Sequence, residues 1–124
     1  MIVRGGRLVA EWNNGVKREA QLQLKSATKS IFSSILGIMI DEGKLPSADA
    51  RLIDYYPEAL DVPEGSGPKP WRYAFPANRD ITFRQLISNT SGYMKPGEEP
   101  GKVFNYQTYG MNVLTHALAK IVGD

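Results

Sequence analysis

The sequence predicts a mainly helical chain with a short β-hairpin at its N-terminus, forming part of a larger domain. Apolar residues recur at steps of three and four over residues 26–42 and again over residues 108–122, which predicts two helices. The Gly5-Gly6 pair lies between two short β-like runs and predicts the hairpin. Two such apolar helices need a sheet or further helices to cover them, and the predicted strands are too few. We therefore expect an incomplete domain.

The N-terminal region is expected to be extended. Residues 2–4 and 7–12 flank the glycine pair and give the two strands of the hairpin. Leu22 and Leu24 alternate with glutamines, which indicates a short extended segment just before the first helix.

The rest of the chain alternates between helices and loops. Gly43 follows the first helix as its C-terminal cap. Residues 61–77 are rich in proline and glycine and predict a loop. Thr82 and Gln85 have the spacing of a capping box, so a short helix is expected to run to about Ser88.

Composition excludes several functions. The net charge of +2 comes from scattered residues, so nucleic-acid binding is not expected. The chain has no cysteine and a single histidine, His116, so thiolate and multi-histidine metal sites are excluded and no cofactor is implied. No apolar run is long enough to span a membrane. No signal peptide is visible, which leaves the compartment open between cytoplasm and periplasm.

The residues with the most chemical potential open the first helix. Ser26 and Lys29 are three residues apart and would share one helix face. The positive potential of a helix N-terminus and burial both disfavour a protonated lysine, and a neutral amine can take the proton of a serine hydroxyl. The alternative is structural: Ser26 caps the helix and Lys29 is solvated. The Ser-x-x-Lys pattern is short, and it recurs at Ser66 within the predicted loop, where we attribute it to chance.

A second candidate precedes the last helix. Tyr106 lies in the stretch Phe-Asn-Tyr-Gln-Thr, where a fixed turn can lower the pKa of a tyrosine and let it act as an acid or base. Thr108 would orient this tyrosine or contact substrate. The structural alternative is that Tyr106 is an aromatic anchor that packs the loop. We expect a structural role for His116.

Taken together, these segments resemble the serine β-lactamase and penicillin-binding-protein superfamily, for which Ser-x-x-Lys is a signature. The stretch KSATKSIFSSILGIMIDEGKL is similar to its nucleophile helix, ITFRQLISNTSGY to its Thr-Ser-Gly segment, and PGKVFNYQTYGMNVL to its tyrosine motif. GGRLVAEW is similar to its N-terminal hairpin. The Tyr-x-Asn-like motif points to the branch of class C β-lactamases, D-alanyl-D-alanine carboxypeptidases and family VIII esterases.

The resemblance implies an α/β fold, a helical region against an antiparallel sheet, of which residues 1–124 are the N-terminal part. It implies that Ser26 is the acylated nucleophile, that Lys29 activates it and that Tyr106 relays the proton. The expected function is serine hydrolysis, through an acyl-enzyme, of a small ester or amide such as a β-lactam or a D-Ala-D-Ala peptide. The alternative is an inactive fragment or a scaffold protein that keeps the fold.

Two residues depart from the family pattern. Thr108 stands where class C β-lactamases usually have asparagine, which argues against a β-lactam-specific enzyme and favours an esterase or an uncharacterised hydrolase. Asn89 stands where histidine is common, which we interpret as a structural variation. The family's third motif, Lys-Thr-Gly or its equivalent, is not found in the sequence. We therefore expect self-association or a complementing chain.

Overall fold

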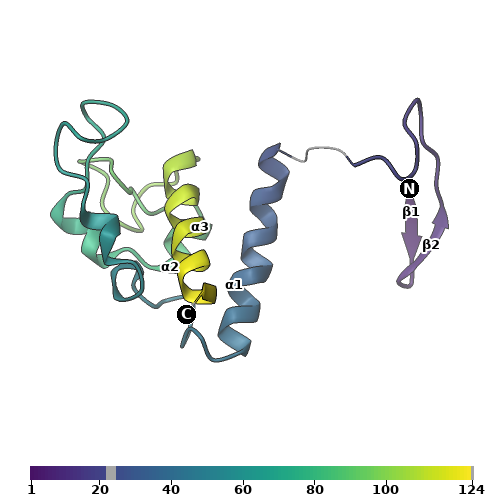
Figure 1. Ribbon diagram of the computed structural model, residues 1–124, viewed down its shortest axis with the longest axis horizontal. Helices are drawn as coiled ribbons and strands as arrows, with labels where there is room; N and C mark the ends of the chain where they lie inside the picture. The colour runs from purple at the N-terminus through teal and green to yellow at the C-terminus, as the bar shows by residue number, and fades with distance from the viewer. Residues whose placement is uncertain (22–24, 124) are drawn as a thin grey trace.

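The computed structural model describes residues 1–21 and 25–123 and shows a helical body with a hairpin set apart from it (Figure 1). The two longer helices run side by side, and shorter helical turns and loops cover one side of α3 (Figure 1). In chain order, the elements are β1 (Ile2–Arg4), β2 (Arg7–Ala10), the 3₁₀ helix η1 (Lys25–Ser30), α1 (Ile31–Asp41), the 3₁₀ turns η2 (Leu52–Asp54), η3 (Pro57–Leu60) and η4 (Pro76–Asp80), α2 (Phe83–Ile87) and α3 (Thr108–Gly123).

The N-terminal hairpin is confirmed. Strands β1 and β2 pair antiparallel, with Arg4 opposite Arg7 on either side of the turn. Gly5 and Gly6 have φ values of 58° and 76°, as a two-residue hairpin turn with positive φ at both central positions requires. Glycine adopts this conformation without the steric cost that a Cβ would add. The extended segment expected at Leu22 and Leu24 lies outside the described residues.

The first long helix begins as a 3₁₀ helix, η1, and continues as α1. The helix predicted over residues 26–42 is therefore present, although its first turns have the tighter winding. Its end is a Schellman motif: the Gly43 N–H donates to the Ile40 carbonyl at 3.0 Å and the Lys44 N–H to the Met39 carbonyl at 2.9 Å. Gly43 has a φ of 76°, so the predicted glycine cap is confirmed.

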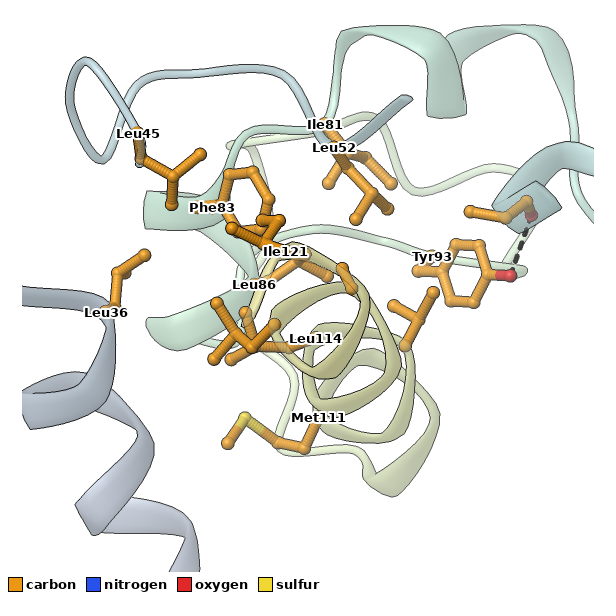
Figure 2. Packing of buried hydrophobic residues seen from close by; sticks show 14 of the residues in the cluster. Leu36, Leu45, Leu52, Ile81, Phe83, Leu86, Tyr93, Met111, Leu114 and Ile121 are labelled. Carbon is orange, nitrogen blue, oxygen red and sulfur yellow. Dashed lines mark hydrogen bonds between the residues drawn. The ribbon is translucent and has the colours of Figure 1, made fainter. Parts of the chain in front are cut away.

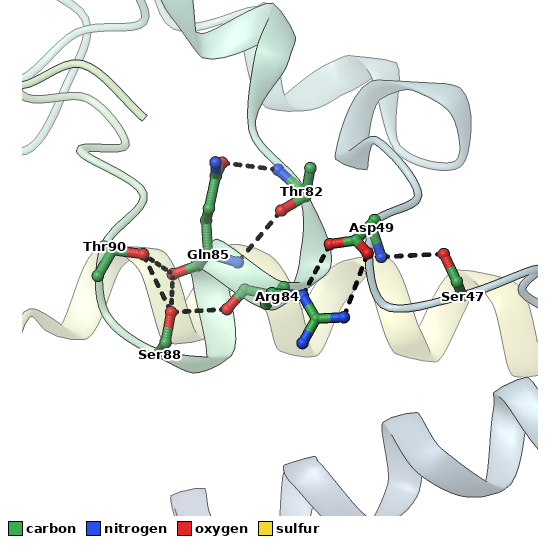
Figure 3. A network of polar contacts seen from close by, with 7 residues as sticks. All are labelled: Ser47, Asp49, Thr82, Arg84, Gln85, Ser88 and Thr90. Atoms are coloured by element: carbon green, nitrogen blue, oxygen red, sulfur yellow. Dashed lines mark hydrogen bonds and ion pairs between the residues drawn. The ribbon is translucent and has the colours of Figure 1, made fainter. Parts of the chain in front are cut away.

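Helix α2 is short, and polar contacts define both its ends (Figure 3). The capping box is confirmed: the Gln85 N–H donates to Thr82 Oγ1 at 3.2 Å, and the Thr82 N–H donates to Gln85 Oε1 at 3.0 Å. At the other end, the Thr90 N–H donates to the Gln85 carbonyl at 2.9 Å, which closes a second Schellman motif. Asn89 occupies its left-handed position with a φ of 59°. Asparagine tolerates this conformation better than most residues, which is a structural reason for asparagine at position 89.

The hydrophobic core forms around α3, the most buried helix (Figure 2). Leu114 and Ala117 are fully buried on the face that packs against α2 and its neighbouring loops. Helix α1 contributes Leu36 and Met39 to the same cluster. The largest side chains buried to less than 2% exposure include Phe83, Leu45, Leu52, Ile81, Leu86 and Leu114.

The apolar surface is only partly covered. Ile31 and Ile38 of α1 are 48% and 55% exposed, and Val122 of α3 is 58% exposed. An apolar groove of about 400 Å³ runs between α1 and α3, lined by residues that include Phe32 and Leu118. The mainly helical character and the hairpin are confirmed, and they are compatible with part of a β-lactamase-like fold. The larger antiparallel sheet stays a prediction, because the described residues form one two-stranded sheet.

Candidate active site

The serine and the lysine of the first candidate motif both lie on η1. A 3₁₀ helix has three residues per turn, so side chains three residues apart stand one above the other. Ser26 and Lys29 therefore share one side of η1, with Ser26 exposed and Lys29 half-buried. This winding aligns the pair more closely than the α-helix that the sequence predicts.

Tyr106 meets this pair from a position 77 residues further along the chain. Lys29 Nζ donates a hydrogen bond to Tyr106 Oη at 3.2 Å and lies 4.9 Å from the centre of the tyrosine ring. The pKa of Tyr106 is lowered by the nearby Ser26 hydroxyl and, after it, by the Lys29 ammonium, because both groups favour the charged phenolate. The residues that the sequence singles out from two separate motifs are thus brought together.

Backbone hydrogen bonds place Tyr106 in this position. The loop before α3 lies along the turn that ends α2: the Asn105 N–H donates to the Asn89 carbonyl at 2.8 Å, and the Gly101 N–H donates to the Thr90 carbonyl at 2.7 Å. The next residue, Tyr106, then projects towards η1. The Schellman motif of α2 therefore fixes the backbone on which the tyrosine depends.

These groups line an open pocket of about 310 Å³. Asn89 also lines this pocket, although the sequence indicated only a structural role for it. Its side-chain oxygen is buried without a hydrogen-bond partner among the described residues. The only sign of this role in the sequence was that Asn89 stands where the family commonly has histidine. The pocket is lined by Ser26, Lys29, Ser30, Ser33, Ile87, Asn89, Tyr106 and Met111.

Thr108 lies apart from these groups. It is exposed at the first residue of α3, and it is not among the described residues that line the pocket. Its role in substrate binding stays a prediction.

The second Ser-x-x-Lys pattern has different surroundings. The Ser66 hydroxyl donates to the Pro63 carbonyl at 2.8 Å, while the Lys69 ammonium lies 5.5 Å from the centre of the Trp71 ring. His116 stacks on the ring of Tyr56, with 6.4 Å between the centroids. These contacts are compatible with non-catalytic roles for Ser66 and His116.

The pocket has the chemistry for proton transfer. A hydroxyl, an amine and a phenol converge there, and either a neutral lysine or a tyrosinate can accept the proton of a serine. A lowered Tyr106 pKa increases the tyrosinate fraction at a given pH. Within residues 1–21 and 25–123, no group of three or more His, Asp or Glu side chains is placed to hold a metal ion. In the same part of the chain, no helix is long and apolar enough to cross a membrane.

The site therefore consists of a serine and a lysine on one helical turn that face a tyrosine from a later loop. The model of the family described as Beta-lactamase matches residues 1–124, and the chain belongs to this family. This membership supports serine-hydrolase chemistry in general. Searches of curated proteins and of solved structures found no match.

Proposed function

We propose that this protein is a serine hydrolase that acts through an acyl-enzyme on an ester or amide. The observation that carries the proposal is the hydrogen bond of 3.2 Å between Lys29 and Tyr106, in the pocket that Ser26 also lines. Family membership supports the same chemistry.

In the proposed reaction, Ser26 Oγ attacks the substrate carbonyl carbon while its proton passes to the Lys29–Tyr106 pair. The tetrahedral intermediate collapses, the bond to the leaving group breaks, and Tyr106 returns the proton to the departing oxygen or nitrogen. Water then attacks the acyl carbon while the same pair accepts one of its protons, the bond from that carbon to Ser26 Oγ breaks, and the pair returns the proton to Oγ as the acid leaves. The lowered pKa of Tyr106 supports this role, because it lets the phenol give up its proton more readily.

The proposed substrates are small esters, β-lactams or D-Ala-D-Ala peptides, and we place the chain in the class C β-lactamase and family VIII esterase branch. Thr108 in place of the usual asparagine favours a small ester. The open pocket beside Tyr106, which is 57% exposed, has room for the acyl group of such a substrate.

The second candidate is an inactive or scaffold protein of the same fold. The half-exposed Tyr106 favours this alternative, because a hydrolase site usually excludes water from its reacting groups. We also propose that residues 1–124 are part of a larger β-lactamase-like domain, in which another segment or a complementing chain covers the site. The exposed apolar residues of α1 support this proposal.

Covalent labelling tests the function. A fluorophosphonate or a fluorescent penicillin is expected to label the wild-type chain and Ser66→Ala, but not Ser26→Ala. Ser66→Ala is a matched control, because it removes the serine of the other Ser-x-x-Lys pattern. Label retained in Ser26→Ala would contradict the assignment of the nucleophile, and no label on the wild type would favour the inactive alternative. Hydrolysis of p-nitrophenyl butyrate or of nitrocefin then separates an esterase from a β-lactamase.

A further inference from the structure

A buried contact lies directly behind the candidate tyrosine. The next residue, Gln107, is 8% exposed, and its Oε1 accepts a hydrogen bond of 2.6 Å from Arg72 Nη2. Arg72 is 6% exposed. Hydrogen bonds from charged donors are stronger than neutral ones, and burial shields this one from water.

The same guanidinium makes a second contact with the start of α3. It lies 4.4 Å from the centre of the Tyr109 ring, so Arg72 holds both Gln107 and Tyr109. These two residues flank Thr108, the first residue of α3. One side chain therefore anchors the helix start to which Tyr106 is joined.

The proline- and glycine-rich loop brings Arg72 to this position. The Arg72 N–H donates to the Lys69 carbonyl at 2.9 Å, and the Ala74 N–H donates to the Val62 carbonyl at 2.8 Å, which closes the loop on itself. Gly67 packs so tightly against the turn that a Cβ there would lie 1.7 Å from the Arg72 carbonyl oxygen. Only glycine therefore fits at position 67 while the backbone of Arg72 keeps its position.

Tyr106 itself depends on its neighbours. More than half of its surface is exposed, and its phenol oxygen accepts a hydrogen bond from Lys29, itself a flexible side chain. The backbone before it is held by the Asn105–Asn89 hydrogen bond. The backbone after it is held by Arg72 through Gln107.

We propose that Arg72 is a positioning residue that holds Tyr106 against Ser26 and Lys29 by way of Gln107. The consequence for catalysis rests on the proposed function, whereas the placement of Tyr106 does not. Small displacements of a reacting group cost about 100-fold in rate, so an anchor that touches no substrate still affects the reaction.

The pKa of the Tyr106 phenol in the folded protein tests the placement. It can be followed with ¹³Cζ-labelled tyrosine and assigned by comparison with Tyr106→Phe. In Arg72→Met the pKa is expected to rise towards its usual value, because the phenol moves away from Ser26 and Lys29. Arg84→Met is the matched control: it removes an exposed arginine of α2 that lies 2.7 Å from Asp49, and it is expected to leave the pKa of Tyr106 unchanged.

A second variant keeps the test decisive where Arg72→Met does not fold. Gln107→Asn retains the amide but shortens the side chain by one methylene group, so that its oxygen no longer reaches Arg72. It is expected to raise the pKa of Tyr106 in the same direction. A Tyr106 pKa equal to that of the wild type in a folded Gln107→Asn or Arg72→Met protein would overturn the proposal, because a purely structural role changes only the stability.

The rate of fluorophosphonate labelling separates this inference from the proposed function. If both are correct, Arg72→Met and Gln107→Asn slow the labelling of Ser26 on the order of 10- to 100-fold, and Arg84→Met does not. A wild-type chain that is not labelled, with a pKa of Tyr106 that still responds to Arg72→Met, would refute the hydrolase and retain the positioning role. Labelling of folded Arg72→Met at the wild-type rate would refute the positioning role and retain the hydrolase.

Discussion

Two tyrosines of this chain have pKa values that move in opposite directions. Tyr93 is buried, and its hydroxyl donates to the Ala59 carbonyl at 2.7 Å. Burial, followed by the nearby Tyr56, raises the pKa of Tyr93 to about 12. Tyr106 is exposed, and the hydroxyl of Ser26 together with Lys29 lowers its pKa. The first environment is that of a core residue, and the second is that of a group able to exchange protons.

The buried tyrosine predicts a loss of stability at high pH. Tyr93 has a pKa of about 12 in the folded state and about 10 when unfolded, so the unfolded chain releases this proton first as the pH rises. The contribution of Tyr93 to stability is therefore complete below pH 10 and is lost between pH 10 and 12. Urea unfolding at pH 9 and at pH 11 measures this loss.

Tyr93→Phe is the control for this effect. It removes the ionising hydroxyl and leaves the Ala59 carbonyl without its donor, so we expect it to lower the free energy of unfolding at pH 7 by about 1–2 kcal/mol. Between pH 9 and 11 it should lose less stability than the wild type. An equal loss in both proteins would show that other groups cause the alkaline transition.

At the scale of single elements, two glycines of the first long helix predict opposite effects. Gly43 ends α1 in the left-handed conformation with a φ of 76°, whereas Gly37 lies in the interior of α1. A Cβ added at either position would meet nothing within 4 Å. Backbone conformation alone therefore determines the result.

We expect Gly43→Ala to lower the free energy of unfolding by about 1–2 kcal/mol, the cost of a left-handed residue with a Cβ. Gly37→Ala is expected to raise it by up to about 1 kcal/mol, because alanine favours the helix interior. Thermal or urea unfolding of the two variants measures both changes. A stabilising Gly43→Ala would contradict the Schellman cap.

Much of this element scale follows from sequence. The glycine pair of the hairpin, the Thr82–Gln85 capping box and Gly43 are local signals, since each involves residues only a few positions apart. The 3₁₀ winding of η1 was not predicted. The left-handed position of Asn89 was not predicted either, because asparagine occurs in many other conformations as well.

At the scale of the whole molecule, the uncovered apolar surface predicts self-association. The groove between α1 and α3 and the exposed Ile38 and Val122 leave an apolar face open to water. Burial of this face against a second copy of the chain would remove apolar surface from water, which is favourable. We expect sedimentation velocity to show species larger than the monomer at micromolar concentrations.

Substitutions on this face test the prediction. Ile38→Glu together with Val122→Glu is expected to shift the chain towards the monomer, because charges resist burial in an apolar interface. Ser66→Glu, at an exposed polar position of the loop over residues 61–77 and outside the groove, is expected to leave the association unchanged. A monomeric wild type at these concentrations would contradict the predicted association.

The sequence by itself determined the candidate residues and several of the elements. Local periodicity, caps and turn residues predict the hairpin, the two long helices, the end of α1 and the start of α2, and the Ser-x-x-Lys and tyrosine motifs identified Ser26, Lys29 and Tyr106 before any distance was known. Their catalytic roles remain proposals.

Only the tertiary structure decided that Lys29 lies 3.2 Å from Tyr106, and that Arg72 from a distant loop holds the residue next to it. Such contacts join residues 35 to 77 positions apart, and they depend on how separate elements pack and on which buried polar groups find partners. No local sequence pattern indicates such long-range contacts, and for this reason the contact between Arg72 and Gln107 was not predicted.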